Sequence, residues 1–599
     1  MFIKVRAEEI LIGGVLGAGL GLAMAAPLAT GMPSLIPQAV EGAWGLGQTL
    51  LALGLATIGA SAGAWFTSRQ ERDSHQRGAQ FFPRFDEARR RLQAIETRQF
   101  SAAQAAGKVH GITIGGVQLS CTREVGHVYA VGLPGAGKTV VLTAAIDQAL
   151  HRGDRVILHD PKGDFIERYY DPQTTVLLGP WDERAAIWDA AADIDSPALA
   201  DEFGAAVCGA GPQAGQNRFF HDAAGILLAG LIRSYQRGGR TWTWSDLTDA
   251  LASDPFKLIR QAAEGNSQVK TAFPSAFAAG GQLTQGERAA LSVLATSSAW
   301  LTNYAALDAA DPDRPRFSLR KWLTREDHVE TRIVIFNSHA QYQSACESIF
   351  GAMLSTIAAT VSSPVMPEIS ADEPGGVWMF LDEFPQLGAV ALGKIQQIAE
   401  LGRSRGLREV LALQDETQLE AKVGREKAAP MLAVQSTRIY MRSSDKTAES
   451  VSKRIGEREI LRIDTTAQDG AVAGKTKRAE KQTVIQPSDL LGLRVRTKEP
   501  PRGVELVMHI EDTLGRLVQP FPPRVVAKAP RLVESETWRR GSLPSVGVAA
   551  AGGGAEQPCE ATPSMDDAAS QPKPEEVAEP DSTKDDDADD TDDNGPPLF

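Results

Sequence analysis

Short apolar runs alternate with longer segments of helical periodicity along the middle of the chain, and this pattern predicts an α/β fold. Most runs are followed by glycine, proline or a polar residue, as expected for buried strands. Because helices separate the strands, we expect a mostly parallel sheet with helices on both faces and a ligand site at the carboxyl ends of the strands. The predicted strands cover residues 128–131, 155–160, 175–178, 332–336, 377–381, 408–413 and 438–441.

One long stretch departs from this alternation. From about residue 196 to residue 310 the pattern is helical and rich in alanine, with short polar breaks and no candidate strand. Further along the chain, residues 504–509 and 516–519 flank a turn and predict a β-hairpin. We therefore predict an all-α domain inserted into an α/β nucleotide-binding domain. The expected bounds are 71–190 and 313–540 for the α/β domain and 191–312 for the insertion.

Two segments near the N-terminus lack charged residues. Ile10–Met32 and Gly42–Ser68 contain 23 and 27 residues, and each is long enough to cross the ~30 Å hydrocarbon core of a bilayer. Basic residues flank the pair on its outer sides, whereas the linking loop contains only the acidic Glu41, so both termini are expected in the cytoplasm. A cleaved signal peptide ending near Ala25 is the alternative, but it would leave the second segment unexplained. The predicted anchor, residues 1–70, has spans at about 10–32 and 43–67.

The net charge of −13 comes from one end of the chain. Ala549–Phe599 contains fifteen Asp and Glu residues and two Lys residues, so the remaining residues carry equal numbers of acidic and basic groups. From about Gly541 the composition predicts a disordered acidic tail, residues 541–599. This tail is expected either to capture a basic partner protein or to act as a solubilising segment. Because acidic and basic residues are balanced in the rest of the chain, its composition does not indicate a basic surface for binding nucleic acid.

The cysteine content argues against a disulfide framework and against a zinc site. The four cysteines lie far apart and show no paired spacing. A reducing compartment is therefore expected.

The strongest chemical signal follows the first predicted strand. Residues 132–139 match the phosphate-binding pattern G-x-x-x-x-G-K-[ST] at every fixed position, between a predicted strand and a predicted helix. Backbone N–H groups of this loop are expected to bind the phosphates of ATP at the helix N-terminus. Lys138 would reach the β- and γ-phosphates, and the Thr139 hydroxyl would coordinate Mg²⁺. The loop consists of Gly132, Leu133, Pro134, Gly135, Ala136, Gly137, Lys138 and Thr139.

A pair of acids supplies the second half of an ATPase signature. The apolar run 377–381 ends in Asp382 and Glu383. After a phosphate loop, such a pair predicts that Asp382 holds the Mg²⁺ shell and that Glu383 orients and polarises the attacking water. Asp160 ends one other predicted strand and Gln414 follows another, so both are expected at the same edge of the sheet, with Asp160 in the nucleotide site.

These motifs resemble the type IV coupling proteins of bacterial conjugation, the TraD and TrwB type of membrane-anchored hexameric ATPase, over about residues 69–525. The resemblance implies a RecA-like P-loop NTPase domain with an inserted all-α subdomain, a two-helix transmembrane anchor in the bacterial inner membrane and a disordered acidic tail. Four sequence runs are more specific to this family than the phosphate loop is. They are Asp160-Pro161-Lys162-Gly163-Asp164, Leu178-Gly179-Pro180-Trp181-Asp182, Leu381-Asp382-Glu383-Phe384-Pro385-Gln386-Leu387 and Leu401-Gly402-Arg403-Ser404-Arg405-Gly406-Leu407.

The same resemblance assigns two further catalytic residues. Arg403 matches the arginine finger that a subunit inserts into its neighbour's site, and Arg405 and Arg408 are rivals for this role. Gln414 matches the residue that senses the γ-phosphate. With Lys138 and Glu383, these residues form the expected catalytic set.

The resemblance also implies partners and a function. A homo-hexamer would use ATP and Mg²⁺ to move single-stranded DNA, led by a relaxase, into a type IV secretion channel. The expected partners are single- and double-stranded DNA, relaxase and relaxosome proteins, channel components and the inner membrane. One alternative is an FtsK-like chromosome translocase, which usually needs a longer membrane part and a terminal DNA-reading domain. Another is a nucleotide-switched docking receptor for protein cargo, against which the intact Glu383 argues.

Overall fold

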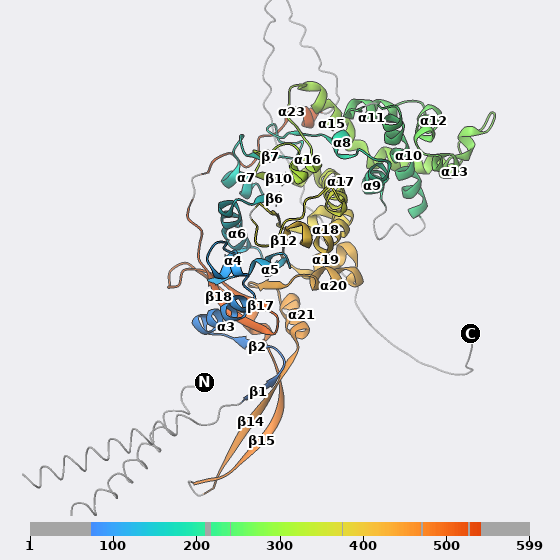
Figure 1. Ribbon diagram of the computed structural model, residues 1–599. Coiled ribbons are helices and arrows are strands. Elements are labelled where there is room, and N and C mark those ends of the chain that lie inside the picture. Colours follow the sequence, from blue (N-terminus) through green and yellow to red (C-terminus); the bar gives the residue numbers. More distant parts are fainter. Residues whose placement is uncertain are drawn as a thin grey trace, which may run out of the picture. The chain divides into compact units, whose positions relative to one another are not determined.

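The computed structural model describes residues 74–209, 217–239, 241–373, 375–468, 471–524 and 527–540. Both predicted membrane spans and the acidic tail lie outside these ranges, so they remain predictions. Figure 1 shows the arrangement of the helices and strands.

The described residues are organised around a mixed sheet of eleven strands. Seven neighbouring strands run parallel, as the sequence predicted, and the antiparallel pair β17 and β18 extends the sheet beyond β13. The parallel strands are, in sheet order, β13 (Thr437–Tyr440), β5 (Val128–Val131), β12 (Leu407–Leu413), β11 (Val377–Leu381), β6 (Arg155–Asp160), β10 (Ile333–Asn337) and β7 (Thr175–Leu177). The others are β17 (Gly503–Ile510), β18 (Thr513–Gln519), β2 (Gln80–Phe82) and β16 (Val495–Arg496).

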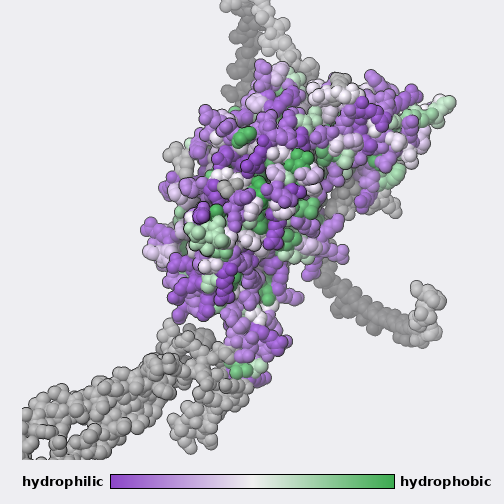
Figure 2. Space-filling model, in the orientation of Figure 1, coloured by the Kyte–Doolittle hydropathy of each residue, from purple (hydrophilic) through white to green (hydrophobic). Residues whose placement is uncertain are grey.

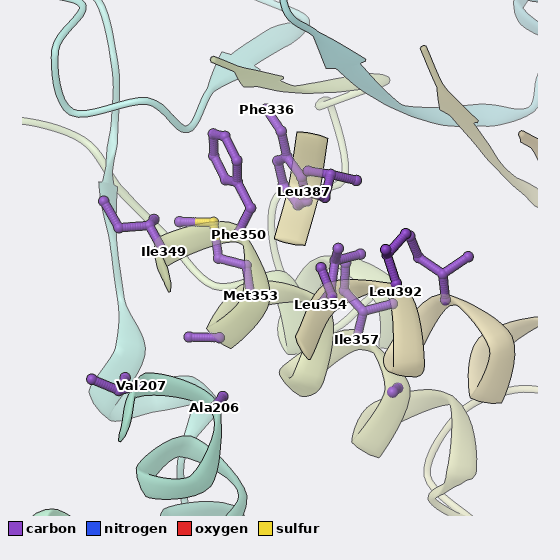
Figure 3. Packing of buried hydrophobic residues seen from close by; sticks show 14 of the residues in the cluster. Ala206, Val207, Phe336, Ile349, Phe350, Met353, Leu354, Ile357, Leu387 and Leu392 are labelled. Carbon is purple, nitrogen blue, oxygen red and sulfur yellow. The ribbon is translucent and has the colours of Figure 1, made fainter. Parts of the chain in front are cut away.

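Helices bury both faces of this sheet, which explains why its strands are apolar throughout. Successive side chains of β5 alternate between two cores: Val128 and Ala130 join the cluster that contains α6 (Lys138–Arg152). Tyr129 and Val131 join the cluster that contains α17 (Gln343–Ser362) and α18 (Gly388–Gly402). Figure 3 shows this second core, where the ring of Phe336 from β10 stacks on Phe350 from α17 at 5.2 Å between centroids. Because both faces are packed, the sheet is a rigid support for the loops that follow its parallel strands.

Every regular element that the structure describes within residues 197–310 is a helix, and short loops connect these helices. The predicted helical insertion is confirmed as secondary structure. Helix α10 (Arg218–Arg237) packs against four other helices and belongs to the same hydrophobic core as α17 and α18. The described residues lie in one compact unit, so the domain boundaries remain predictions. The helices around α10 are α9 (Pro197–Cys208), α12 (Pro255–Gly265), α13 (Gln268–Ala272) and α14 (Gln285–Ser297).

One helical segment within the described ranges, Ala340–Ser362, is long and apolar enough to cross a bilayer. It contains α17, and 72% of its most apolar window is buried inside the fold, where it packs against α18 and α9. Its apolar side chains therefore fill a core. On the face shown in Figure 2, hydrophilic residues predominate and hydrophobic ones are scattered, and single exposed apolar residues are normal on a protein surface.

A long two-stranded ribbon was not predicted from the sequence. Strands β14 (Glu457–Gln468) and β15 (Ala471–Thr483) pair antiparallel, and β1 (Ser74–Arg77) adds to β14. The sequence of both long strands is rich in charged residues and lacks the apolar alternation that indicates a half-buried strand. The segment that follows the predicted anchor is thus paired with this ribbon.

Candidate nucleotide-binding site

The phosphate loop connects β5 to α6 at the carboxyl edge of the parallel strands. Gly135 and Gly137 have φ angles of 73° and 98°, a region that side chains strongly disfavour. Gly137 also caps the N-terminus of α6, so the positive end of this helix faces the loop. A Cβ atom on Gly137 would lie 2.4 Å from Cγ2 of Val504, whereas one on Gly135 would meet nothing within 4 Å.

This difference gives a matched pair of substitutions. Both Gly135→Ala and Gly137→Ala force a side chain into the left-handed region, which costs about 1–2 kcal/mol. We expect Gly137→Ala to lower the free energy of unfolding by a further ~1–3 kcal/mol, because β17 must move away from the new methyl group. Urea unfolding of the two variants checks this expectation. Equal destabilisation would show that the contact with Val504 is not restrictive.

At this edge, the side chain of Lys138, the first residue of α6, meets two side chains that follow β11 and β12. Nζ of Lys138 donates a hydrogen bond to the carbonyl oxygen of Gly132 at 2.8 Å and forms an ion pair with Oε1 of Glu383 at 3.1 Å. Nε2 of Gln414 donates to the same Glu383 oxygen at 2.7 Å. Lys138 and Glu383 are both buried, so each depends on the other for neutralisation of its charge. The structure thus brings together three of the four residues expected in catalysis.

The two acids after β11 differ in environment. Glu383 has a φ angle of 50° and a ψ angle of 44°, a strained conformation for a non-glycine residue that often marks a functional site. Burial and the neighbouring Glu383 carboxylate raise the pKa of Asp382 to about 6. A bound cation would offset both the burial of Asp382 and its repulsion by Glu383, and would therefore lower the pKa of Asp382.

The donor set at this edge fits Mg²⁺ better than a transition metal. The Asp382 carboxylate and the Thr139 hydroxyl provide the oxygen ligands that Mg²⁺ prefers. In the ranges described, no group of three or more His, Cys, Asp or Glu residues could hold a metal ion. A Mg²⁺ ion with few protein ligands, completed by phosphate and water oxygens, is the usual arrangement in nucleotide sites.

Asp160 lies at the expected edge but has a structural role there. Its carboxylate accepts hydrogen bonds from the backbone N–H groups of Phe165 and Ile166, both at 2.9 Å, and of Lys162 at 3.3 Å. The bonds from Phe165 and Ile166 satisfy N–H groups in the first turn of α7 (Asp164–Tyr169). Asp160 does not join the Lys138 contacts, and direct nucleotide binding by this residue stays a prediction.

His159 is a site residue that the sequence analysis missed. Nδ1 lies 2.6 Å from the carbonyl oxygen of Asp382, and Nε2 lies 2.8 Å from Oγ of Ser338. Burial lowers the pKa of His159 to about 4, so the ring is neutral near pH 7; Nδ1–H donates to the carbonyl and Nε2 accepts from the hydroxyl. His159 therefore links the ends of β6, β10 and β11. A histidine directly after the apolar run Val156–Leu158 was the signal available in the sequence.

The three candidate finger arginines differ in their surroundings. Arg403, in the short helix η5 (Arg403–Arg405), is exposed, and its guanidinium forms no hydrogen bond or ion pair with the described residues. Arg405 is partly buried and donates to the carbonyl of Met366 at 2.7 Å. Arg408 is completely buried and pairs with Glu124 at 3.2 Å. Arg403 is thus the one of the three that is free to reach another molecule.

The position of η5 also matters. It precedes β12, whereas Gln414 and the phosphate loop lie at the opposite, carboxyl edge of the sheet. A strand of this length spans about 20 Å, so Arg403 cannot reach the phosphate loop of its own chain.

The difference in burial predicts that loss of Arg408 destabilises the protein much more than loss of Arg403. Arg408→Leu is expected to lower the free energy of unfolding by about 3–5 kcal/mol, because Glu124 loses one partner of a buried ion pair. Arg403→Leu should change it by no more than about 0.5 kcal/mol, since the side chain is exposed. Urea unfolding of both variants measures the difference. Comparable losses would contradict the burial that separates the two arginines.

A family model and a named relative point to the same kind of protein. Residues 111–498 match the family model described as the type IV secretion-system coupling protein DNA-binding domain. The coupling protein TraD of Escherichia coli (strain K12) is 26% identical over 398 residues, which cover 65% of this chain and 52% of TraD. The chain thus spans about half the length of this relative.

Solved structures of the conjugative coupling protein TrwB share the fold. An unbound form has a TM-score of 0.60 at 20% identity and covers 78% of this chain and 98% of its own. TrwB in complex with ADP and Mg²⁺ has a TM-score of 0.59 at 19% identity and covers 78% and 99%. The chain therefore has a TrwB-like α/β fold with a mixed central sheet.

Proposed function

Because this chain belongs to the type IV secretion-system coupling protein family, we propose that it is an ATP-driven DNA translocase that links a relaxase–single-stranded DNA complex to a type IV secretion channel during conjugation. The observation that most directly supports the ATP-driven part of this proposal is that Lys138 and Gln414 both contact one oxygen of Glu383. The family match favours this function over a chromosome translocase.

The order of the strands supports a RecA-like core. Strand β12 lies between the phosphate-loop strand β5 and β11, which ends in Asp382 and Glu383. Gln414, at the end of β12, would therefore face the γ-phosphate between the lysine and the acid. Such a position suits a residue that reports whether ATP or ADP is bound.

Each residue then has a defined step. The loop amides and the N-terminus of α6 would bind the phosphates, and Lys138 would exchange Glu383 for the γ-phosphate as its partner. The released Glu383 carboxylate would orient the attacking water and accept its proton. Thr139 and Asp382 would hold Mg²⁺, which would neutralise phosphate charge during transfer.

The site as proposed needs a second subunit. Arg403 is exposed and lies at the edge of the sheet away from its own phosphate loop, which suits insertion into the site of a neighbour in a homo-hexamer. The ring would sit at the bacterial inner membrane on the two predicted spans.

Plasmid transfer in the native host tests this function. Deleting the gene should reduce transfer to background, the wild-type chain should restore it, and Glu383→Gln should not, because the pump needs hydrolysis. Full restoration by Glu383→Gln would reject the pump and favour the nucleotide-switched docking receptor.

The acidic tail is proposed to capture the relaxase or an accessory DNA-binding protein. Ending the chain at Gly541 should leave ATP hydrolysis unchanged but lower transfer, and binding of the basic partner to the full chain should weaken with salt, since exposed charges are screened. Transfer assays with both chains measure this effect. Wild-type transfer by the shortened chain would leave the tail as a solubilising segment.

A further inference from the structure

A buried histidine, His127, joins the phosphate-loop strand to the segment that carries Arg403. It directly precedes β5, and Nε2 of its ring lies 2.8 Å from the carbonyl oxygen of Ala399. Nδ1 of the ring accepts a hydrogen bond from the backbone N–H of Glu409 at 3.1 Å. Ala399 lies in the last turn of α18 and Glu409 lies in β12, so the two bonds hold both flanks of the turn that contains Arg403.

Both bonds require a neutral ring with its proton on Nε2. Nδ1 can accept only when it carries no proton, and Nε2–H must then donate to the Ala399 carbonyl. Burial lowers the pKa of His127 to about 4, so this form predominates near pH 7. Both partners of the ring are main-chain atoms, and the contact therefore fixes the backbone on either side of Arg403.

A second contact ties the same segments together. Glu124, just ahead of His127, pairs with the buried Arg408 at 3.2 Å, and Nη1 of Arg408 donates to the carbonyl of Gly406 at 2.9 Å. Space for this guanidinium requires glycine at position 376, where a Cβ atom would lie 2.0 Å from Nη1. The exposed guanidinium of Arg403 itself makes no bond with the described residues, so the backbone around it sets its position.

We propose that His127 is a positioning residue for Arg403 and couples the arginine offered to a neighbouring subunit to the phosphate-loop strand of its own subunit. This inference rests on the proposed ATPase with an arginine supplied in trans. A displacement of about 1 Å in a catalytic group can cost roughly 10²-fold in rate. The effect of losing His127 therefore falls on the turnover of the neighbour and leaves nucleotide binding in the same subunit intact.

Mixed rings of the full-length protein separate these two effects. Subunits with Lys138→Ala keep the arginine but lack the phosphate-binding lysine, and subunits with Arg403→Ala have the opposite defect. Co-expression with two different tags and purification in detergent over both tags yields rings that contain both. Their ATP hydrolysis comes from Arg403→Ala subunits completed by Arg403 of a Lys138→Ala neighbour.

His127→Asn is then added to one kind of subunit at a time. In the Lys138→Ala subunit, which donates the arginine, it should lower the restored hydrolysis by roughly 10- to 100-fold. In the Arg403→Ala subunit, which only binds ATP, the restored rate should stay within about twofold of its value without the change. Asparagine tolerates the φ angle of 62° at this position but is too short to reach both partners.

Two further variants sharpen the test. His127→Gln carries an amide donor and acceptor and should retain more of the restored hydrolysis than His127→Asn. His110→Asn changes an exposed histidine and should have no effect in either subunit. If His127→Asn lowers the restored hydrolysis equally in the Lys138→Ala and the Arg403→Ala subunits, His127 has a general structural role and does not position Arg403. No restored hydrolysis before His127 is changed, with ATP still bound by the Arg403→Ala subunits, would instead reject the arginine in trans on which the inference rests.

Discussion

Glu383→Gln is expected to slow ATP hydrolysis by about 10²–10⁴-fold while ATP stays bound. The amide cannot accept a proton from the attacking water, and it no longer neutralises Lys138, whose ammonium group lies 3.1 Å from the wild-type carboxylate. Lys138 should therefore remain available to the γ-phosphate. Binding of a fluorescent ATP analogue, measured beside phosphate release, separates the two effects.

Lys138→Ala is the matched comparison. It removes the phosphate-binding cation itself, so hydrolysis and ATP binding should be lost together. An equal loss of ATP binding in the two variants would overturn the role given to Glu383, because it would make this acid part of the binding surface.

Arg403→Ala is expected to reduce the hydrolysis rate of the assembled protein by about 10³–10⁵-fold, the range reported for removal of an arginine finger. Its stability and its affinity for ATP should change little, because the side chain is exposed and lies away from its own phosphate loop. Steady-state hydrolysis by purified rings measures the loss.

Arg405→Ala is the control for this substitution, since the two residues share the short helix η5. Arg405 donates to the carbonyl of Met366, so its loss should affect local stability and leave most of the hydrolysis rate. A near-normal hydrolysis rate for Arg403→Ala together with a severe loss for Arg405→Ala would show that Arg405, and not Arg403, is the arginine finger.

Much of the sheet could be predicted because its parallel strands are buried on both faces. Residues 156–158 and 377–381 are completely enclosed, and enclosure on both sides requires contiguous apolar runs. The phosphate loop was equally clear, since its glycines are required by local backbone geometry. The β14–β15 ribbon gave no such signal, because charged residues recur along both strands.

The roles of individual polar residues were harder to predict, because they depend on tertiary partners. The sequence does not show that Asp160 caps α7, or that His127 and His159 bond to backbone atoms far away in the chain. Arg408 is an instructive exception. It shares a strand face with Val410 and Ala412, whose burial the strand pattern already implied, so the sequence contained a reason to rank it below Arg403.

The central claim is that this chain hydrolyses ATP in order to move DNA. The most direct test is ATP hydrolysis by the full-length protein in detergent, with and without single-stranded DNA, against Lys138→Ala as the blank. We expect hydrolysis above the blank that rises when DNA is added. A rate equal to the blank would contradict the ATPase, and a rate indifferent to DNA would contradict the pump.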